Sequence, residues 1–158
     1  RGSSIVFGGA SEEFYTGELK TYPLISETYW VTSLDGITVG GEYVRGGKAI
    51  IDTGTSLIIG APSIIGPVLE KIGDVNPSCR GVEDLPDVDF IFGGDKYTLT
   101  SSDYVIRVTQ FGQTECINGF MAMPVPLDNA VIVGDVFLKT FFTEFDQSNN
   151  TVSFARAK

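Results

Sequence analysis

The most informative stretch of this sequence is Ala49-Ile50-Ile51-Asp52-Thr53-Gly54-Thr55-Ser56. An apolar run of strand type leads into an acidic residue, which is followed at once by a glycine and hydroxyl side chains. Hydrogen bonds from backbone N–H groups and hydroxyls stabilise the ionised form of a carboxylate, and glycine lets the backbone turn close to it. The stretch therefore predicts a strand that delivers Asp52 into a tight loop supported by Thr53, Gly54, Thr55 and Ser56.

Two other interpretations of this loop remain open at this point. Asp52 in an Asx-type turn between two strands would only cap its own loop. An apolar strand, an aspartate and a Gly-Thr-Ser sequence are also found in the first phosphate loop of sugar kinases and actin-like ATPases. Those proteins carry a second such loop, whereas this motif occurs once in the chain.

The amino-acid composition excludes several classes of catalytic and binding site. The chain has no histidine, which removes histidine-based acid–base catalysis, Ser-His-Asp and Cys-His nucleophiles, and the usual zinc sites. A net charge of −9 argues against a nucleic-acid binder, which needs a basic surface. The charge fits an ordinary soluble surface or a protein that works in acid, where carboxylates are partly protonated. Because the chain has no histidine, any chemistry must use carboxylates or lie elsewhere.

Length and apolar content predict one domain. A chain of 158 residues buries its own core, and 42% apolar residues exclude a disordered chain. Apolar runs such as Ala130–Val133 are too short to span a bilayer. The chain has only two cysteines, Cys79 and Cys116, and they are either buried thiols or one disulfide that closes a long loop.

The pattern along the chain is one of short strands with glycine-rich turns. We expect strands at Ser4–Phe7, Tyr29–Val39 and Lys48–Ile51, and hairpins formed by residues 88–99 and 143–155. Two helices interrupt them. One begins at Pro62 with Ile64, Ile65, Val68, Leu69 and Ile72 on one face and stops at Gly73, and a short second helix is expected over Val136–Phe142.

Further motifs occur in order downstream of the loop. They are Val131-Ile132-Val133-Gly134-Asp135-Val136-Phe137-Leu138, then Phe142-Thr143-Glu144-Phe145-Asp146, then Asn149-Asn150-Thr151-Val152-Ser153-Phe154-Ala155. With Phe7-Gly8-Gly9, Tyr15-Thr16-Gly17, Tyr29-Trp30, Leu34-Asp35, Leu85-Pro86-Asp87, Cys116 and Gly119-Phe120-Met121, this set closely resembles the C-terminal lobe of the pepsin and cathepsin D family of aspartic proteases. The resemblance covers essentially the whole chain.

The resemblance implies an all-β fold with a few short helices, a single β-barrel-like lobe with a ψ-loop. Residues 1–158 would form the C-terminal lobe of a bilobal protease, whose N-terminal lobe is absent from this chain. Ile132-Val133-Gly134 would thread beside the loop of Asp52, the catalytic aspartate of this lobe. Retroviral proteases pair identical single-loop chains, but they are much shorter than this one.

The resemblance also implies a substrate-binding set. Thr55 and Ser56 match hydroxyls that contact the loop or the substrate backbone. Apolar positions match the walls of primed-side subsites, and they are Tyr29, Ile50, Met123, Val125 and Ile132. Core packing is an equally good interpretation of Met123 and Ile132, and Tyr29 also fits a buried strand aromatic.

Cys79 and Cys116 match a disulfide of the family, which implies the secretory pathway, with an extracellular, lysosomal or acidic-vacuole location. The resemblance implies no metal and no cofactor. Its partners would be the N-terminal lobe, peptide or protein substrates and pepstatin-type inhibitors. Asn149-Asn150-Thr151 is a formal glycosylation sequon, but a hairpin turn explains it without sugar.

We therefore predict the catalytic lobe of an aspartic endopeptidase that hydrolyses peptide bonds at acidic pH with a carboxylate-activated water. The isolated lobe is expected to be inactive, because it carries one aspartate loop where the mechanism uses two. The competing prediction is a catalytically inactive pepsin-like lobe that acts as a binding or structural module.

Overall fold

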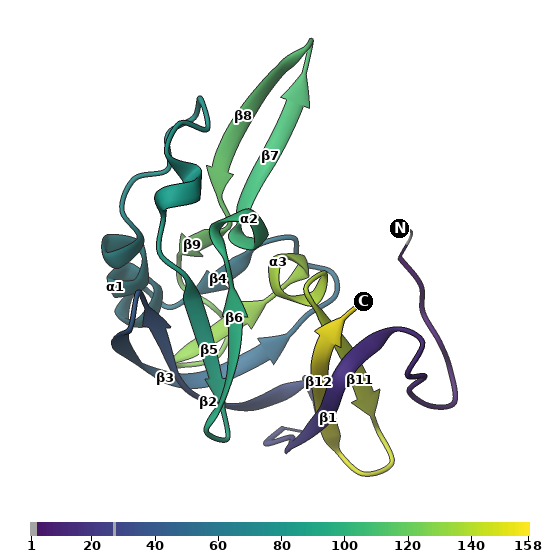
Figure 1. Cartoon of the computed structure of the whole chain (residues 1–158). Helices are drawn as coiled ribbons and strands as arrows, with labels where there is room; N and C mark the ends of the chain where they lie inside the picture. The colour runs from purple at the N-terminus through teal and green to yellow at the C-terminus, as the bar shows by residue number, and fades with distance from the viewer. Residues whose placement is uncertain (1–2, 27) are drawn as a thin grey trace.

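The computed structural model describes residues 3–26 and 28–158, which are mostly β-strand. The largest sheet has seven strands in the order β6-β5-β2-β3-β10-β4-β9 (Figure 1). Its strands are β2 Val31–Val39, β3 Glu42–Ile51, β4 Ile58–Gly60, β5 Val88–Phe92, β6 Asp95–Leu99, β9 Phe120–Ala122 and β10 Ala130–Val133. This confirms the predicted all-β class with a few short helices, although the sheets stay open rather than closing into a barrel.

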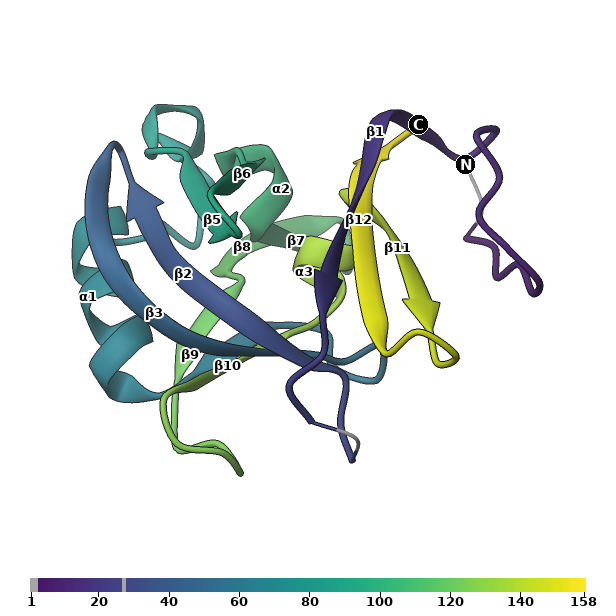
Figure 2. The same cartoon turned by 90° about the horizontal axis from the view of Figure 1, so that it is seen from below.

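A three-stranded sheet stands beside one end of the large sheet (Figures 1 and 2). Its order is β1-β12-β11, formed by β1 Tyr15–Pro23, β11 Phe141–Asp146 and β12 Thr151–Ala157. All neighbouring strands in it are antiparallel. The predicted hairpin over residues 143–155 lies in β11 and β12, and its turn is closed by Asn149, whose backbone N and Nδ2 donate to Asp146 at 3.0 and 2.8 Å. These bonds support the turn interpretation of the sequon.

The first predicted helix is confirmed as α1 Pro62–Ile72. Proline suits its first turn because the missing N–H has no partner there in any case. Ile64, Ile65, Val68 and Ile72 are buried, and Leu69 is half-buried, as the apolar spacing predicts. Gly73 ends the helix with a φ of 82°, a conformation that favours glycine.

For three predicted elements, the secondary structure differs from the prediction. Residues 4–7 form no strand and are exposed. β2 begins at Val31 rather than Tyr29, which leaves Tyr29 in the connection after β1. The predicted helix Val136–Phe142 is only α3 Asp135–Leu138, because Phe141 and Phe142 pair with β12 as a strand. Local apolar pattern did not distinguish a helical turn from the strand that follows it.

The main core is a cluster of aromatic rings between the two larger sheets. Phe90 and Phe92 come from β5, Phe137 from α3 and Phe154 from β12, and none of the four is accessible to solvent. The centroids of Phe92 and Phe154 are 5.2 Å apart, and those of Phe137 and Phe154 are 5.3 Å apart. Aromatic pairs at such distances add to the free energy of burial. This core therefore fixes the three-stranded sheet against the large one.

The third sheet is the hairpin of β7 Val105–Gln110 and β8 Gln113–Asn118, which projects from the body of the molecule (Figure 1). Its base adjoins α2 Ser101–Tyr104, and Cys116 of β8 forms a disulfide with Cys79, across 37 positions of sequence. Cys79 lies just before the short helix η1 Val82–Asp84. The predicted disulfide is confirmed, and it anchors the hairpin to the loop that follows α1.

Candidate active site

Asp52 lies where three strands of the large sheet meet. β3 ends at Ile51, and β4 begins at Ile58 after the loop of residues 52–57. β10 inserts between these two strands, parallel to β3 with Val133 opposite Ile51, and antiparallel to β4 with Val133 opposite Ile58. The backbone N–H of Asp52 donates to the carbonyl of Val133 at 3.1 Å. The structure therefore contains the ψ-shaped arrangement expected for Ile132-Val133-Gly134.

The Asp52 carboxylate is held by two bonds from its own loop. The backbone N–H of Gly54 donates to Oδ1 at 2.9 Å, and the hydroxyl of Thr55 donates to Oδ2 at 2.7 Å. Asp52 is half-buried, so its carboxylate remains accessible. Each oxygen thus accepts one hydrogen bond, and together the two bonds fix the plane of the carboxylate.

Gly134 brings β10 and the loop into direct backbone contact. A Cβ placed on this residue would lie 2.1 Å from the carbonyl oxygen of Thr55 and 2.4 Å from that of Leu57. Hydrogen bonds also join the Asp52 loop to the residues that follow Gly134. The N–H of Asp135 donates to the carbonyl of Thr55 at 2.8 Å, and the N–H of Val136 donates to the carbonyl of Ser56 at 3.1 Å. A side chain at position 134 is therefore excluded by backbone, which cannot move aside without displacing the Asp52 loop.

A pocket of about 310 Å³ opens beside Asp52. Three of the predicted substrate-binding residues line it, namely Tyr29, Ile50 and Ile132. The remaining lining residues were not predicted as site residues, and they are Thr28, Trp30, Ile51 and Pro126. Among the residues that the structure describes, Asp52 is the one charged group in this lining, and most of the other lining residues are apolar. Such a space suits an apolar side chain placed next to a reacting polar group.

The other predicted residues lie around this pocket. Val125 packs with Ile50 and Ile132 in a small apolar cluster that is separate from the main core. Met123 is 44% exposed and is not among the lining residues. Thr53 and Ser56 are exposed on the loop, and Thr55 is half-buried. The structure therefore brings Tyr29, Ile50 and Ile132 together with Asp52, and it places Met123 outside the pocket wall.

Trp30 is the most informative of the lining residues that the sequence did not indicate. Its carbonyl accepts a hydrogen bond from the N–H of Ile51 at 2.8 Å, so its backbone lies against the residue that precedes Asp52. The sequence offered one indication of this role, because Trp30 directly follows the predicted site residue Tyr29, but the segment was predicted to be a regular strand. In a strand, neighbouring side chains point to opposite faces, and this expectation failed because β2 begins only at Val31.

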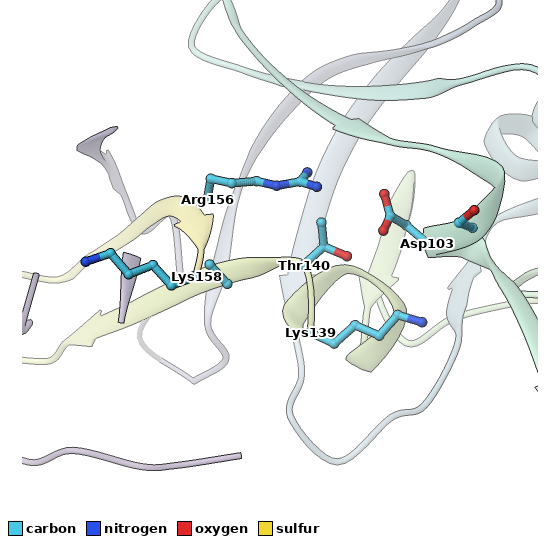
Figure 3. A pocket seen from close by; sticks show the side chains of 7 residues that line it. Asp103, Lys139, Thr140, Arg156 and Lys158 are labelled. Atoms are coloured by element: carbon cyan, nitrogen blue, oxygen red, sulfur yellow. The ribbon is translucent and has the colours of Figure 1, made fainter. Parts of the chain in front are cut away.

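A second pocket, of about 380 Å³, lies near the C-terminus and is lined by Ser102, Asp103, Lys139, Thr140, Arg156, Ala157 and Lys158 (Figure 3). The carboxylate of Asp103 caps α2 by accepting from Thr100. The guanidinium of Arg156 lies 5.6 Å from the ring centre of Phe141. The ammonium of Lys158 points away from the pocket (Figure 3) and donates to Glu12 O at 2.9 Å. We assign these groups structural roles.

Two findings bear on other site types. Within residues 3–26 and 28–158, no three His, Cys, Asp or Glu side chains gather closely enough to hold a metal ion. No helix in this described part of the chain is long and apolar enough to cross a membrane.

The fold and the site define a pepsin-like lobe, and comparison with known proteins agrees. Residues 1–157 match the family of eukaryotic aspartyl proteases, and the chain belongs to that family. Cathepsin D of Chionodraco hamatus is 37% identical over 99% of this chain. Cathepsin D of Dictyostelium discoideum is 36% identical over 99% of the chain, and pepsin A of Suncus murinus is 37% identical over 98%.

These alignments cover 43%, 44% and 42% of the three relatives. The chain therefore spans less than half the length of the curated relatives that it matches. Family membership also decides between the two enzymatic interpretations of the Asp52 loop, in favour of the protease family over nucleotide-binding proteins.

Proposed function

We propose that residues 1–158 are the C-terminal lobe of a two-lobed aspartic endopeptidase, and that Asp52 is the catalytic aspartate of this lobe. The observation that carries the proposal is the geometry of Asp52. Its carboxylate accepts from Gly54 N and Thr55 Oγ1, and it faces a pocket with largely apolar walls. A rigid acidic group beside an apolar pocket is suited to activating a water against a bound peptide.

The reaction needs a second aspartate from an N-terminal lobe. Two carboxylates at close range cannot both ionise, so they share one proton and titrate as a pair, as is known for aspartic proteases. The ionised member removes a proton from a water held between them, and this water attacks the scissile carbonyl. The protonated member donates a hydrogen bond to the carbonyl oxygen as negative charge develops there. Acidic pH favours this singly protonated pair.

The substrate is a peptide or protein, and the pocket takes one of its apolar side chains. Tyr29, Ile50 and Ile132 are the proposed contacts, and Val125 packs against the apolar cluster that contains Ile50. Thr55 and Ser56 are proposed to face the substrate backbone. Met123 is an outer contact, because it is exposed and lies outside the lining. Pepstatin-type inhibitors are proposed to bind the same site in the complete enzyme.

The three-stranded sheet supports the proposal of a second lobe. β1 and β11 are its outer strands, and backbone groups at a sheet edge are available for pairing. Residues 3–10 lie outside any strand, with Ile5 84% and Phe7 93% exposed. Apolar side chains exposed to this degree next to an open sheet edge are typical of a surface that another body covers. We propose that the N-terminal lobe covers it.

The compartment follows from the disulfide. A bond between Cys79 and Cys116 persists in oxidising compartments and is rare in the cytosol. We therefore propose the secretory pathway, ending outside the cell or in an acidic organelle.

The test is turnover of an apolar peptide by the complete enzyme, this lobe joined to its N-terminal lobe, between pH 3 and 6. Asp52→Asn keeps the shape of the side chain but neither ionises nor carries the shared proton. It should lower kcat by more than about two to four orders of magnitude, the usual effect of losing one general acid or base. Thr55→Ala should cost less, because it removes one hydrogen bond and leaves the carboxylate in place.

The matched control is Asp74→Asn, which changes an exposed aspartate beyond the end of α1 and should leave turnover unchanged. Circular dichroism of each variant checks the fold. Near-native turnover by Asp52→Asn across the pH series would show that Asp52 is not catalytic. A complete protein that cleaves nothing while it still binds peptides would indicate the inactive binding module instead.

A further inference from the structure

Trp30 connects the candidate active site to the rest of the lobe. It is the only tryptophan of the chain. It is one of the residues that line the pocket beside Asp52, and its carbonyl accepts from the N–H of Ile51, the residue before Asp52. It is also one of the partly buried residues that pack against the main core. Trp30 therefore belongs both to the lining of the pocket and to the packing around the main core.

The ring that holds Trp30 in place comes from the other sheet. Phe145 lies in β11 of the three-stranded sheet, and its ring centroid is 4.9 Å from that of Trp30, with an angle of 69° between the ring planes. Phe145 does not line the pocket. An edge-to-face contact of this kind has a preferred orientation, so the position of Phe145 restricts how the indole turns toward or away from the pocket.

We propose that Phe145 is a positioning residue that sets the orientation of Trp30, and that Trp30 thereby determines the size of the apolar side chain the pocket accepts. The inference rests on the proposed function, because it concerns the selectivity of that same site. It also has a consequence for the second lobe. β11 is an outer strand of the three-stranded sheet, so a lobe that docks along this edge acts on the pocket through Phe145 and Trp30.

Among the described residues, Phe145 provides the one aromatic ring that pairs with the indole of Trp30. Replacing Phe145 by alanine leaves a void behind the indole, and the ring then occupies several orientations. A pocket wall with several orientations discriminates poorly between large and small side chains, since discrimination in apolar pockets depends on close packing.

The first arm of the test uses the 158-residue chain and the fluorescence of its single tryptophan. Phe145→Ala should shift the emission maximum to longer wavelength and increase quenching by acrylamide, and Phe145→Leu should do so to a smaller extent. Phe145→Tyr keeps the ring edge and should restore the native spectrum. The matched control is Phe142→Ala in the same strand, because Phe142 pairs with Tyr15 at 5.1 Å instead and should leave the Trp30 spectrum unchanged.

The second arm uses the complete enzyme and three peptides that differ at one position on the carboxyl side of the cleaved bond, with Phe, Leu or Ala there. In Phe145→Ala the ratio of kcat/KM between the Phe and Ala peptides should fall by roughly tenfold, the scale on which apolar pockets discriminate. The loss should appear in KM more than in kcat, because the aspartate pair is untouched. Phe145→Tyr and Phe142→Ala should retain the native ratio.

The outcomes separate the two proposals. An active Phe145→Ala or Phe145→Leu enzyme with unchanged selectivity, or an equal spectral change in Phe142→Ala, would overturn the positioning role. A complete enzyme that cleaves none of the peptides, alongside the expected fluorescence changes, would overturn the proposed function while leaving the packing of Trp30 by Phe145 established. If Phe145→Ala does not fold, Phe145→Leu carries both measurements.

Discussion

Gly134 and Gly54 show how residues without side chains position the Asp52 carboxylate. Gly54 donates its N–H to Asp52 from within the loop, and a Cβ on it would lie 3.3 Å from Asp52 Oδ1. At Gly134 the neighbours of an added Cβ are backbone atoms at 2.1 to 2.7 Å. A methyl group at position 54 could be accommodated by a small shift of the Asp52 side chain. A methyl group at position 134 would force the backbone of the loop away from β10.

These contacts predict unequal costs for the two alanine substitutions. Gly134→Ala should lower the free energy of unfolding by about 1–3 kcal/mol or more, the range for overpacked interiors. Gly54→Ala should cost within about 1 kcal/mol, as is usual for substitutions without a severe clash. Urea unfolding of both variants at one pH measures the difference. Equal destabilisation by the two would contradict the close approach of β10 to the loop.

Among the elements, β1 and β6 are joined by a network of side-chain hydrogen bonds. Lys20 donates to Asp95 Oδ1 at 2.8 Å, and the hydroxyl of Tyr22 donates to Asp95 Oδ2 at 2.8 Å. The hydroxyls of Tyr22 and Tyr97 lie 2.5 Å apart. The hydrogen bond from Lys20, and then the one from Tyr22, lowers the pKa of Asp95. Burial raises the pKa of Tyr22 and of Tyr97, so both hydroxyls keep their protons across the acidic and neutral range.

The lowered pKa of Asp95 predicts a pH dependence with a definite sign. Because the folded state holds Asp95 ionised below the usual pKa of about 4, the stability it contributes is present above that pH and is lost as pH falls through the folded pKa. Asp95→Asn should therefore be less stable than the native chain at pH 5, and the difference should narrow toward pH 2. Urea unfolding across this pH series measures it.

The matched control is Glu83→Gln in η1, an exposed acidic residue whose neutralisation should leave the curve nearly unchanged. A constant difference between Asp95→Asn and the native chain at every pH would show that ionisation of Asp95 does not contribute to joining β1 with β6.

The molecule as a whole contains one Asp-Thr-Gly loop. Its three-stranded sheet has β1 and β11 as outer strands. The aromatic core and the disulfide lie within the lobe, and a core of this size supports folding of one domain. The proposed chemistry, in contrast, requires a second carboxylate.

We therefore expect the 158-residue chain to fold cooperatively and to show no peptidase activity on an apolar peptide at pH 3–6, because losing one member of a catalytic unit removes most of the rate. Mixing it with a separately produced N-terminal lobe should restore turnover. Turnover by the purified chain alone that pepstatin inhibits and Asp52→Asn abolishes would favour a homodimer over the two-lobed enzyme.

Sequence patterns predicted the parts of the structure that depend on near neighbours in the chain. The apolar spacing over residues 62–72 predicted α1 because its residues contact one side of the core at helical intervals. The run ending at Asp52 predicted the loop because its hydrogen bonds, from Gly54 and Thr55, are local. The ordered motifs, taken together, identified the family.

The remaining surroundings of Asp52 depend on contacts between segments that are distant in the sequence. Trp30 and Pro126 are far apart in sequence, and they line one pocket because β10 inserts between β3 and β4 and brings its preceding loop beside the connection that enters β2. The start of β2 at Val31 rather than Tyr29 likewise depends on pairing with β3. Periodicity indicates which face of an element is buried, but convergence of distant segments is set by strand order, which local sequence does not encode.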